Sequence, residues 1–195
     1  MPNEITTWLD TRYIKKLEMG TPDNMFPSDN PYLAIVEGYL TAEQCKAIIE
    51  APKDKGHYKF PGCGATTYEY PRPLPQELFP VSWGAEKINE LYWCFDLAAP
   101  DTAWLQKYYA GSSYQKHVDT TPGQSRKLTA IALLSDPSDY QGGDLTFYMP
   151  NESKQMPKTM GTVIVFPSWM WHGVDKINSG LRYSLNIGFY GPPFK

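Results

Sequence analysis

Cysteine and histidine are scarce in this chain of 195 residues, which has three of each. The cysteines, Cys45, Cys63 and Cys94, are odd in number and widely spaced, and no C-x-x-C pair occurs. This pattern excludes a zinc ribbon and gives no support to a disulfide framework. We therefore expect reduced thiols, with Cys45 and Cys94 facing the core on helices.

An excess of basic residues is also missing, as is any long apolar run. The net charge of −3 and the pI near 5.6 provide no basic surface for nucleic acid. No apolar stretch approaches the roughly 20 residues that span a bilayer, and residues 1–10 hold no apolar segment typical of a signal peptide. The sequence accordingly predicts a cytoplasmic protein with neither nucleic acid nor a membrane as partner.

The first half of the chain predicts helices separated by one long irregular segment. Residues 32–36 have the pattern of a strand, and Thr41 with Gln44 forms a capping box that begins a helix ending near Glu50. A second helix is expected over residues 82–95. Between them, residues 51–81 contain six prolines. This loop is either a surface excursion or a flap over the active site, in which Tyr68 and Tyr70 would grip a substrate.

The second half of the chain predicts short strands separated by glycine and proline turns. We expect these strands near residues 103–109, 115–119, 127–134, 144–149, 162–166 and 181–190. Such spacing is typical of a sandwich or barrel. The predicted fold is α+β and mainly β: a single domain over 1–195, in which residues 101–193 form a jelly-roll core. Residues 1–100 would supply the loop 51–81 and helices packed on one sheet.

Three polar residues in this half have the spacing of a metal site. His117 and Asp119 are two residues apart on an expected strand, so their side chains point the same way. His172 follows downstream. Two histidines and one carboxylate make up the facial triad of non-haem Fe(II) oxygenases, which leaves open positions for substrate and oxygen.

The last expected strand adds a candidate anion site. Arg182, Ser184 and Asn186 share one face of it, and the apolar residues occupy the other. A solvated face would account for these three residues. In a barrel, however, an inward arginine without an anion carries a high desolvation cost, and its planar fork matches a carboxylate. A metal and an acid-binding arginine in one lumen fit a dicarboxylate that reaches both.

Four motifs carry a resemblance to a known family. Residues 108–119, 133–145, 161–168 and 182–184 occur in the family's order, with His172 between the last two. They resemble the 2-oxoglutarate- and Fe(II)-dependent dioxygenases, in particular the prolyl 4-hydroxylase-like group and its PKHD-type hydroxylases. The resemblance covers roughly residues 31–50 and 85–193. It implies a double-stranded β-helix, the cupin-like form of the jelly roll.

The resemblance also implies roles for individual residues. His117, Asp119 and His172 would bind Fe(II), and Arg182 would hold the distal carboxylate of 2-oxoglutarate. Ser184 and Tyr108 would support that carboxylate, with Tyr109 as a competitor for the role of Tyr108. Two tryptophans flank the third metal ligand, Trp169 and Trp171, and either line a substrate channel or pack in the core.

The implied reaction uses Fe(II), 2-oxoglutarate and O2, with ascorbate as reductant, and yields succinate, CO2 and a hydroxylated product. The substrate would be a protein or peptide, with proline first among its candidate side chains. A free amino acid or another small molecule is an alternative. A cupin-like metal-dependent hydrolase is a further alternative, although His-Glu-x-x-His is absent. A barrel that only binds a partner is the third.

Overall fold

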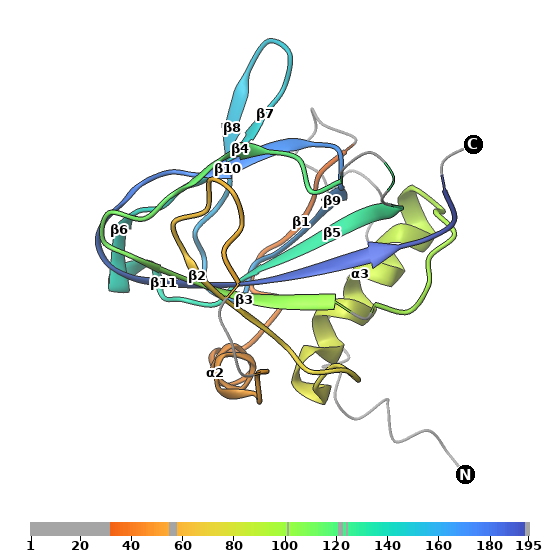
Figure 1. The fold of residues 1–195 in the computed structure, drawn as a ribbon, viewed down its shortest axis with the longest axis horizontal. Helices are drawn as coiled ribbons and strands as arrows, with labels where there is room; N and C mark the ends of the chain where they lie inside the picture. The colour runs from red at the N-terminus through yellow and green to blue at the C-terminus, as the bar shows by residue number, and fades with distance from the viewer. Residues whose placement is uncertain (1–31, 55–57, 101, 121–122, 124, 194–195) are drawn as a thin grey trace.

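A computed structural model describes residues 32–54, 58–100, 102–120, 123 and 125–193 (Figure 1). Within them, two antiparallel sheets face each other. The larger sheet has the order β1 (Ala34–Val36), β9 (Val163–Pro167), β5 (Arg126–Leu133), β11 (Ile177–Tyr190), β3 (Thr102–Tyr109) and β2 (Thr66–Glu69), and β6 (Tyr140–Gly142) also pairs with β11. The smaller sheet has the order β4 (Tyr114–His117), β10 (Trp171–Val174), β7 (Leu145–Tyr148) and β8 (Ser153–Gln155). This is the expected mainly β fold, in the form of a double-stranded β-helix.

The helices lie against the large sheet on the side away from the small one (Figure 1). They are α2 (Ala42–Glu50) and α3 (Phe79–Tyr92), and two short 3-10 helices, η3 (Gln76–Leu78) and η4 (Pro137–Asp139), complete the set in the described residues. Because the large sheet is covered on both faces, every residue of β5 is buried. Leu128 and Ala130 of β5 pack with the helices, whereas Ile131 and Leu133 face the lumen between the sheets.

The helix signals in the sequence are confirmed with small shifts. Thr41 caps α2, and the reciprocal bond from the Thr41 backbone N–H to the Gln44 side chain completes the capping box. The second helix begins at Phe79, three residues before the expected start, because Pro80 is well suited to a first helical turn. No helix of the described residues is long and apolar enough to cross a membrane.

The expected strands are present, but their bounds differ and four further strands occur. β4 ends at His117, so Asp119 lies beyond it, and β11 begins at Ile177. The strands β2, β6, β8 and β10 were not foreseen. β2 lies inside the segment 51–81, and η3 and the start of α3 lie there too. The view of that segment as one irregular loop is therefore wrong, since β2 pairs along its full length with β3.

The cysteines lie at three different depths. Cys45 is buried in the helix-side core, as expected. Cys94 is exposed, because it follows the end of α3 with a positive φ of 50°. The expectation that Cys94 faces the core is therefore wrong. Cys63 is partly buried and packs against the lumen cluster.

Candidate metal and cosubstrate site

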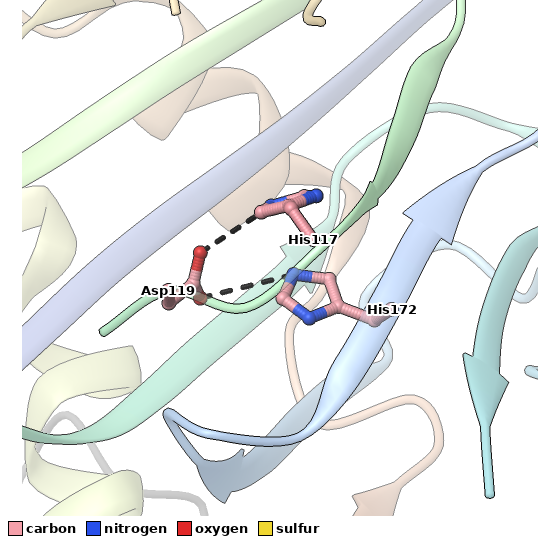
Figure 2. A group of neighbouring side chains, drawn as sticks. All are labelled: His117, Asp119 and His172. Atoms are coloured by element: carbon pink, nitrogen blue, oxygen red, sulfur yellow. Dashed lines mark ion pairs between the residues drawn. The ribbon is translucent and has the colours of Figure 1, made fainter. Parts of the chain in front are cut away.

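His117, Asp119 and His172 meet in the lumen, at the end of β4 (Figure 2). The two histidines are register partners across β4 and β10. Asp119 lies two residues past the strand, and its backbone N–H donates to the carbonyl oxygen of Ser168 at 2.9 Å. Its Oδ1 is 3.5 Å from Nε2 of His117 and its Oδ2 is 3.8 Å from Nε2 of His172. One ligand atom from each residue falls within 4.8 Å of the others, so all three can hold one metal ion.

Both imidazoles are oriented by backbone carbonyls. Nδ1 of His117 lies 2.8 Å from the Gln115 carbonyl oxygen, and Nδ1 of His172 lies 3.0 Å from that of Met170. Because a carbonyl only accepts, Nδ1 carries the hydrogen in each ring and Nε2 presents its lone pair to the site. Burial lowers the pKa of His172, which favours the neutral, metal-binding form.

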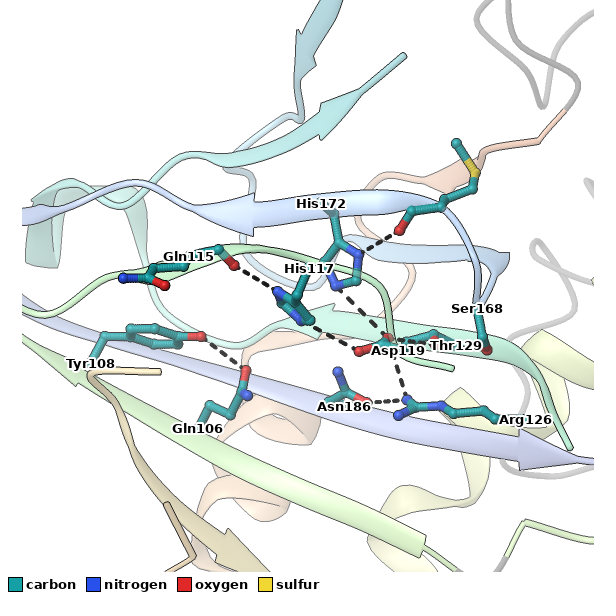
Figure 3. A network of polar contacts seen from close by, with 11 residues as sticks. Gln106, Tyr108, Gln115, His117, Asp119, Arg126, Thr129, Ser168, His172 and Asn186 are labelled. Carbon is teal, nitrogen blue, oxygen red and sulfur yellow. Dashed lines mark hydrogen bonds and ion pairs between the residues drawn. The ribbon is translucent and has the colours of Figure 1, made fainter. Parts of the chain in front are cut away.

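Asp119 is held in its charged form by its neighbours, of which Thr129 and Arg126 lie outside the triad (Figure 3). Thr129 Oγ1 donates to Oδ2 at 2.6 Å, and Nη2 of Arg126 lies 3.6 Å from the same oxygen. Burial alone would raise the pKa of Asp119, but Arg126, His172 and the hydrogen bonds keep it well below its ordinary value. Arg126 in turn donates to Asn186 Oδ1 at 2.6 Å.

Sequence reasoning missed Arg126 and Thr129. The available signal for Arg126 was a charged residue that opens an otherwise largely apolar strand, and the available signal for Thr129 was a lone hydroxyl within it. Neither signal names a partner, because the partner Asp119 is brought to both residues only by the tertiary fold.

Arg182 lies deep in the same lumen. It is 2 % exposed, on the inward face of β11 together with Ser184 and Asn186, as the alternation predicted. Its Nη1 donates to Ser184 Oγ at 3.3 Å, and its guanidinium carbon lies 5.2 Å from the centre of the Tyr108 ring. No carboxylate of the described residues forms an ion pair with it. One pocket is lined by Arg182, by Tyr108 and by both triad histidines.

The remaining predicted residues divide by location. Tyr108 is fully buried and lines the pocket, whereas Tyr109 is 40 % exposed on the other face of β3. Trp171 precedes His172 on β10 and is 49 % exposed, next to Lys116, so it lies outside the lumen. Trp169 is 41 % exposed and contacts the edge of Phe95.

The two loop tyrosines are not brought to the triad. Tyr70 is fully buried in the helix-side core, where its hydroxyl donates to the Ile48 carbonyl at 2.6 Å. Tyr68 packs against the same core. These contacts place both tyrosines on the helix side of the large sheet, opposite the lumen.

The donor set fits a non-haem Fe(II) ion and an anionic cosubstrate. Two imidazoles with their Nε2 lone pairs presented to the site and one carboxylate on one side of an ion leave its other side open. Arg182 is a buried cation without a counter-charge among the described residues, and an organic carboxylate would supply one. The two sites share one pocket, as a small dicarboxylate that engages both would require.

Comparison with known proteins agrees with a site for Fe(II) and an anionic cosubstrate. Residues 103–190 match the model of the 2OG-Fe(II) oxygenase superfamily. A PKHD-type hydroxylase of Synechococcus sp. (strain CC9902) is 40% identical over 80 residues, covering 40% of this chain and 36% of the relative. A PKHD-type hydroxylase of Prochlorococcus marinus is 35% identical over 81 residues, with the same coverage of 40% and 36%. The matched segment thus spans only about a third of each relative.

Solved structures share the fold. The viral collagen prolyl hydroxylase of Paramecium Bursaria Chlorella virus-1, in its 2OG complex, has a TM-score of 0.69 at 17% identity, over 86% of this chain and 100% of that one. A prolyl hydroxylase from Trichoplax adhaerens, in complex with a hypoxia inducible factor peptide fragment, has a TM-score of 0.67 at 14% identity, over 93% and 94%. The segment 103–190, which matches the 2OG-Fe(II) oxygenase model, also holds the triad and Arg182, and the described residues share the fold of these solved prolyl hydroxylases.

Proposed function

We propose that this protein is a 2-oxoglutarate- and Fe(II)-dependent dioxygenase that hydroxylates an unactivated C–H bond, with prolyl 4-hydroxylase-like action on a protein or peptide. The observation that carries the proposal is the combination of the triad with the uncompensated Arg182 in one pocket. A hydrolase on a cupin-like barrel would have use for the metal but none for a buried guanidinium.

The residues divide the work of the reaction. When Fe(II), 2-oxoglutarate and O2 are bound, such a site splits 2-oxoglutarate to succinate and CO2 and delivers one oxygen atom to a C–H bond as a hydroxyl. His117, Asp119 and His172 would hold the metal. Arg182, supported by Ser184 and Tyr108, would hold the distal carboxylate.

The walls of the lumen would keep water from the reacting groups. Phe147 and Phe166 pack around His172, with ring centres 5.5 Å and 4.9 Å from that of the imidazole. Ile131 and Leu145 line the pocket itself and belong to the same apolar cluster as the two phenylalanines. Exclusion of water strengthens the pairing of Arg182 with a carboxylate, because the local dielectric constant falls.

A large substrate would approach the triad from the side of His117. The His117 side chain is 21% exposed, whereas that of His172 is 3% exposed. Tyr114 stacks on the His117 ring at 3.8 Å between centres and borders this open side. A peptide approaching here would reach the metal site without entering the arginine end of the pocket. The likeness to a prolyl hydroxylase solved with a peptide supports the same choice.

The test is succinate formation by the anaerobically iron-loaded protein given 2-oxoglutarate, ascorbate and O2, with and without a pool of proline-rich peptides. We expect slow succinate formation alone and stimulation by the peptides. Asp119→Ala should abolish turnover. Arg182→Ala should raise the 2-oxoglutarate requirement sharply with little change in metal affinity.

Three results would redirect the proposal. Stimulation by free amino acids and not by peptides would move the substrate to the small-molecule alternative. An unchanged 2-oxoglutarate requirement in Arg182→Ala would remove that residue from the cosubstrate site. No succinate and no binding of 2-oxoglutarate would favour the hydrolase or a binding barrel.

A further inference from the structure

Side chains on the lumen face of the large sheet form three matched pairs across β3 and β11. The register places Tyr108 opposite Arg182 and Gln106 opposite Ser184. Trp104 lies opposite Asn186, next to Arg126. Gln106 therefore occupies the middle of the floor that runs from the arginine end of the pocket toward the triad. Gln106 is 7% exposed and lines the pocket, and the proposed reaction does not yet assign it a role.

Gln106 accepts the hydroxyl proton of Tyr108 in this structure. The Tyr108 hydroxyl donates to Gln106 Oε1 at 3.0 Å (Figure 3). A hydroxyl has one hydrogen, so Tyr108 cannot at the same time donate to an anion. Within the described part of the chain, Nε2 of Gln106 has no hydrogen-bond partner. In this structure Tyr108 is therefore the donor of the hydrogen bond, Gln106 is the acceptor, and the amide nitrogen of Gln106 donates to no described residue.

A primary amide can reverse the direction of this hydrogen bond by a rotation of its terminal group alone. Its oxygen and nitrogen occupy nearly equivalent positions, and its terminal torsion has two broad, roughly opposite minima. After a half-turn, Nε2 would donate to the Tyr108 oxygen, and the Tyr108 proton would be free to turn elsewhere. The hydrogen bond between the two residues is kept in both settings, so the Tyr108 hydroxyl has a partner in each.

We propose that Gln106 is a positioning residue that switches from acceptor to donor toward Tyr108 when a carboxylate binds at Arg182. The inference rests on the proposed function, because it takes 2-oxoglutarate as that carboxylate. Before binding, the amide oxygen of Gln106 accepts the hydrogen bond of the Tyr108 hydroxyl. Upon binding, Tyr108 donates to the carboxylate and the amide donates to Tyr108. Glutamine is suited to this position because glutamate only accepts and methionine does neither.

The test is the dissociation constant of 2-oxoglutarate for the Mn(II)-loaded protein, measured by calorimetry, so that no turnover is needed. Gln106→Glu keeps the tyrosine proton captured and adds a negative charge, so we expect affinity to fall about tenfold or more. Gln106→Met has a similar volume and releases the proton, so we expect affinity within about threefold of the unmodified protein. Gln155→Glu on the exposed edge strand β8 makes the same charge change and should have no effect.

The same substitution in a Tyr108→Phe background separates switching from simple charge repulsion. Without the hydroxyl there is no proton to capture, so the penalty of Gln106→Glu should shrink at least about threefold. An equal penalty in both backgrounds would overturn the switch, as would a loss in Gln106→Met as large as in Gln106→Glu. Failure of the unmodified Mn(II) protein to bind 2-oxoglutarate would instead overturn the proposed function, and the switch with it.

Discussion

Replacing Thr129 with valine tests how the carboxylate of Asp119, the proposed metal ligand, is held. Thr129 is fully buried, and its hydroxyl donates to Asp119 Oδ2 at 2.6 Å. Valine keeps the shape of the side chain but removes the hydroxyl, which also lies 3.2 Å from Ser168 Oγ. The backbone bond from Asp119 to Ser168 and the ion pair with Arg126 remain. The carboxylate should therefore stay charged and in place but lose one of its orienting contacts.

The expected size of the effect follows from the kind of bond lost. A hydrogen bond to a charged group contributes about 1.5–3 kcal/mol, and removal of a partner that orients a metal ligand lowers metal affinity roughly 10- to 100-fold. We expect Thr129→Val to raise the Fe(II) dissociation constant within that range. The free energy of unfolding of the metal-free protein should fall by about 1–3 kcal/mol.

The assay is anaerobic competition for Fe(II) against a chelator of known affinity, accompanied by urea unfolding of the metal-free protein. Thr146→Val is the matched control, because Thr146 is also buried and donates to a carboxylate outside the metal site, Asp175 Oδ2, at 3.3 Å. It should lower stability and leave metal affinity unchanged. Equal metal affinity in the Thr129→Val and unmodified proteins would refute the argument that Thr129 orients Asp119.

Two further predictions concern the helix-side core. Burial raises the pKa of Cys45 to about 11, above the roughly 8.5 of an unfolded thiol. The buried neutral thiol therefore contributes its full stability below about pH 8.5, and this contribution is lost as the pH rises toward 11. Urea unfolding should show the difference between the unmodified protein and Cys45→Ala shrinking over this interval, and native alkylation at pH 8 should label Cys94 first. Tyr70→Phe leaves the Ile48 carbonyl without its buried donor and should lower the free energy of unfolding by about 1–3 kcal/mol; an unchanged urea midpoint would contradict that contact.

The candidate metal site was only partly predictable from local patterns. Alternation along a strand places residues two apart on one face, and the inward set Arg182, Ser184 and Asn186 is confirmed by their burial. The pairing of His117 with His172 across two strands came from the family resemblance, since no periodicity links residues 55 positions apart. β10, which carries His172, has only four residues, too few for a pattern to show.

The parts that were not predictable depend on distant partners. β2 lies in a proline-rich segment, and only its pairing with β3 makes it a strand. If the same segment were a flap, as one of the two interpretations held, Tyr70 would lie at the substrate, but the pairing turns that residue toward the helices. Arg126 acquires its role from the position of Asp119, and Gln106 from that of Tyr108. Sequence patterns indicate on which face of a strand a side chain lies more readily than which distant residue it contacts.

The position of β11 has a consequence for synthesis on the ribosome. It is the last strand along the described chain, yet it lies in the middle of the large sheet and pairs with β3, β5 and β6. Until residues 177–190 have left the ribosomal tunnel, β3 and β5 have no central partner, and their apolar side chains stay open to chaperones or to other nascent chains. The arginine end of the pocket is built on that same strand, so the capacity to bind a carboxylate would arise only when the sheet closes.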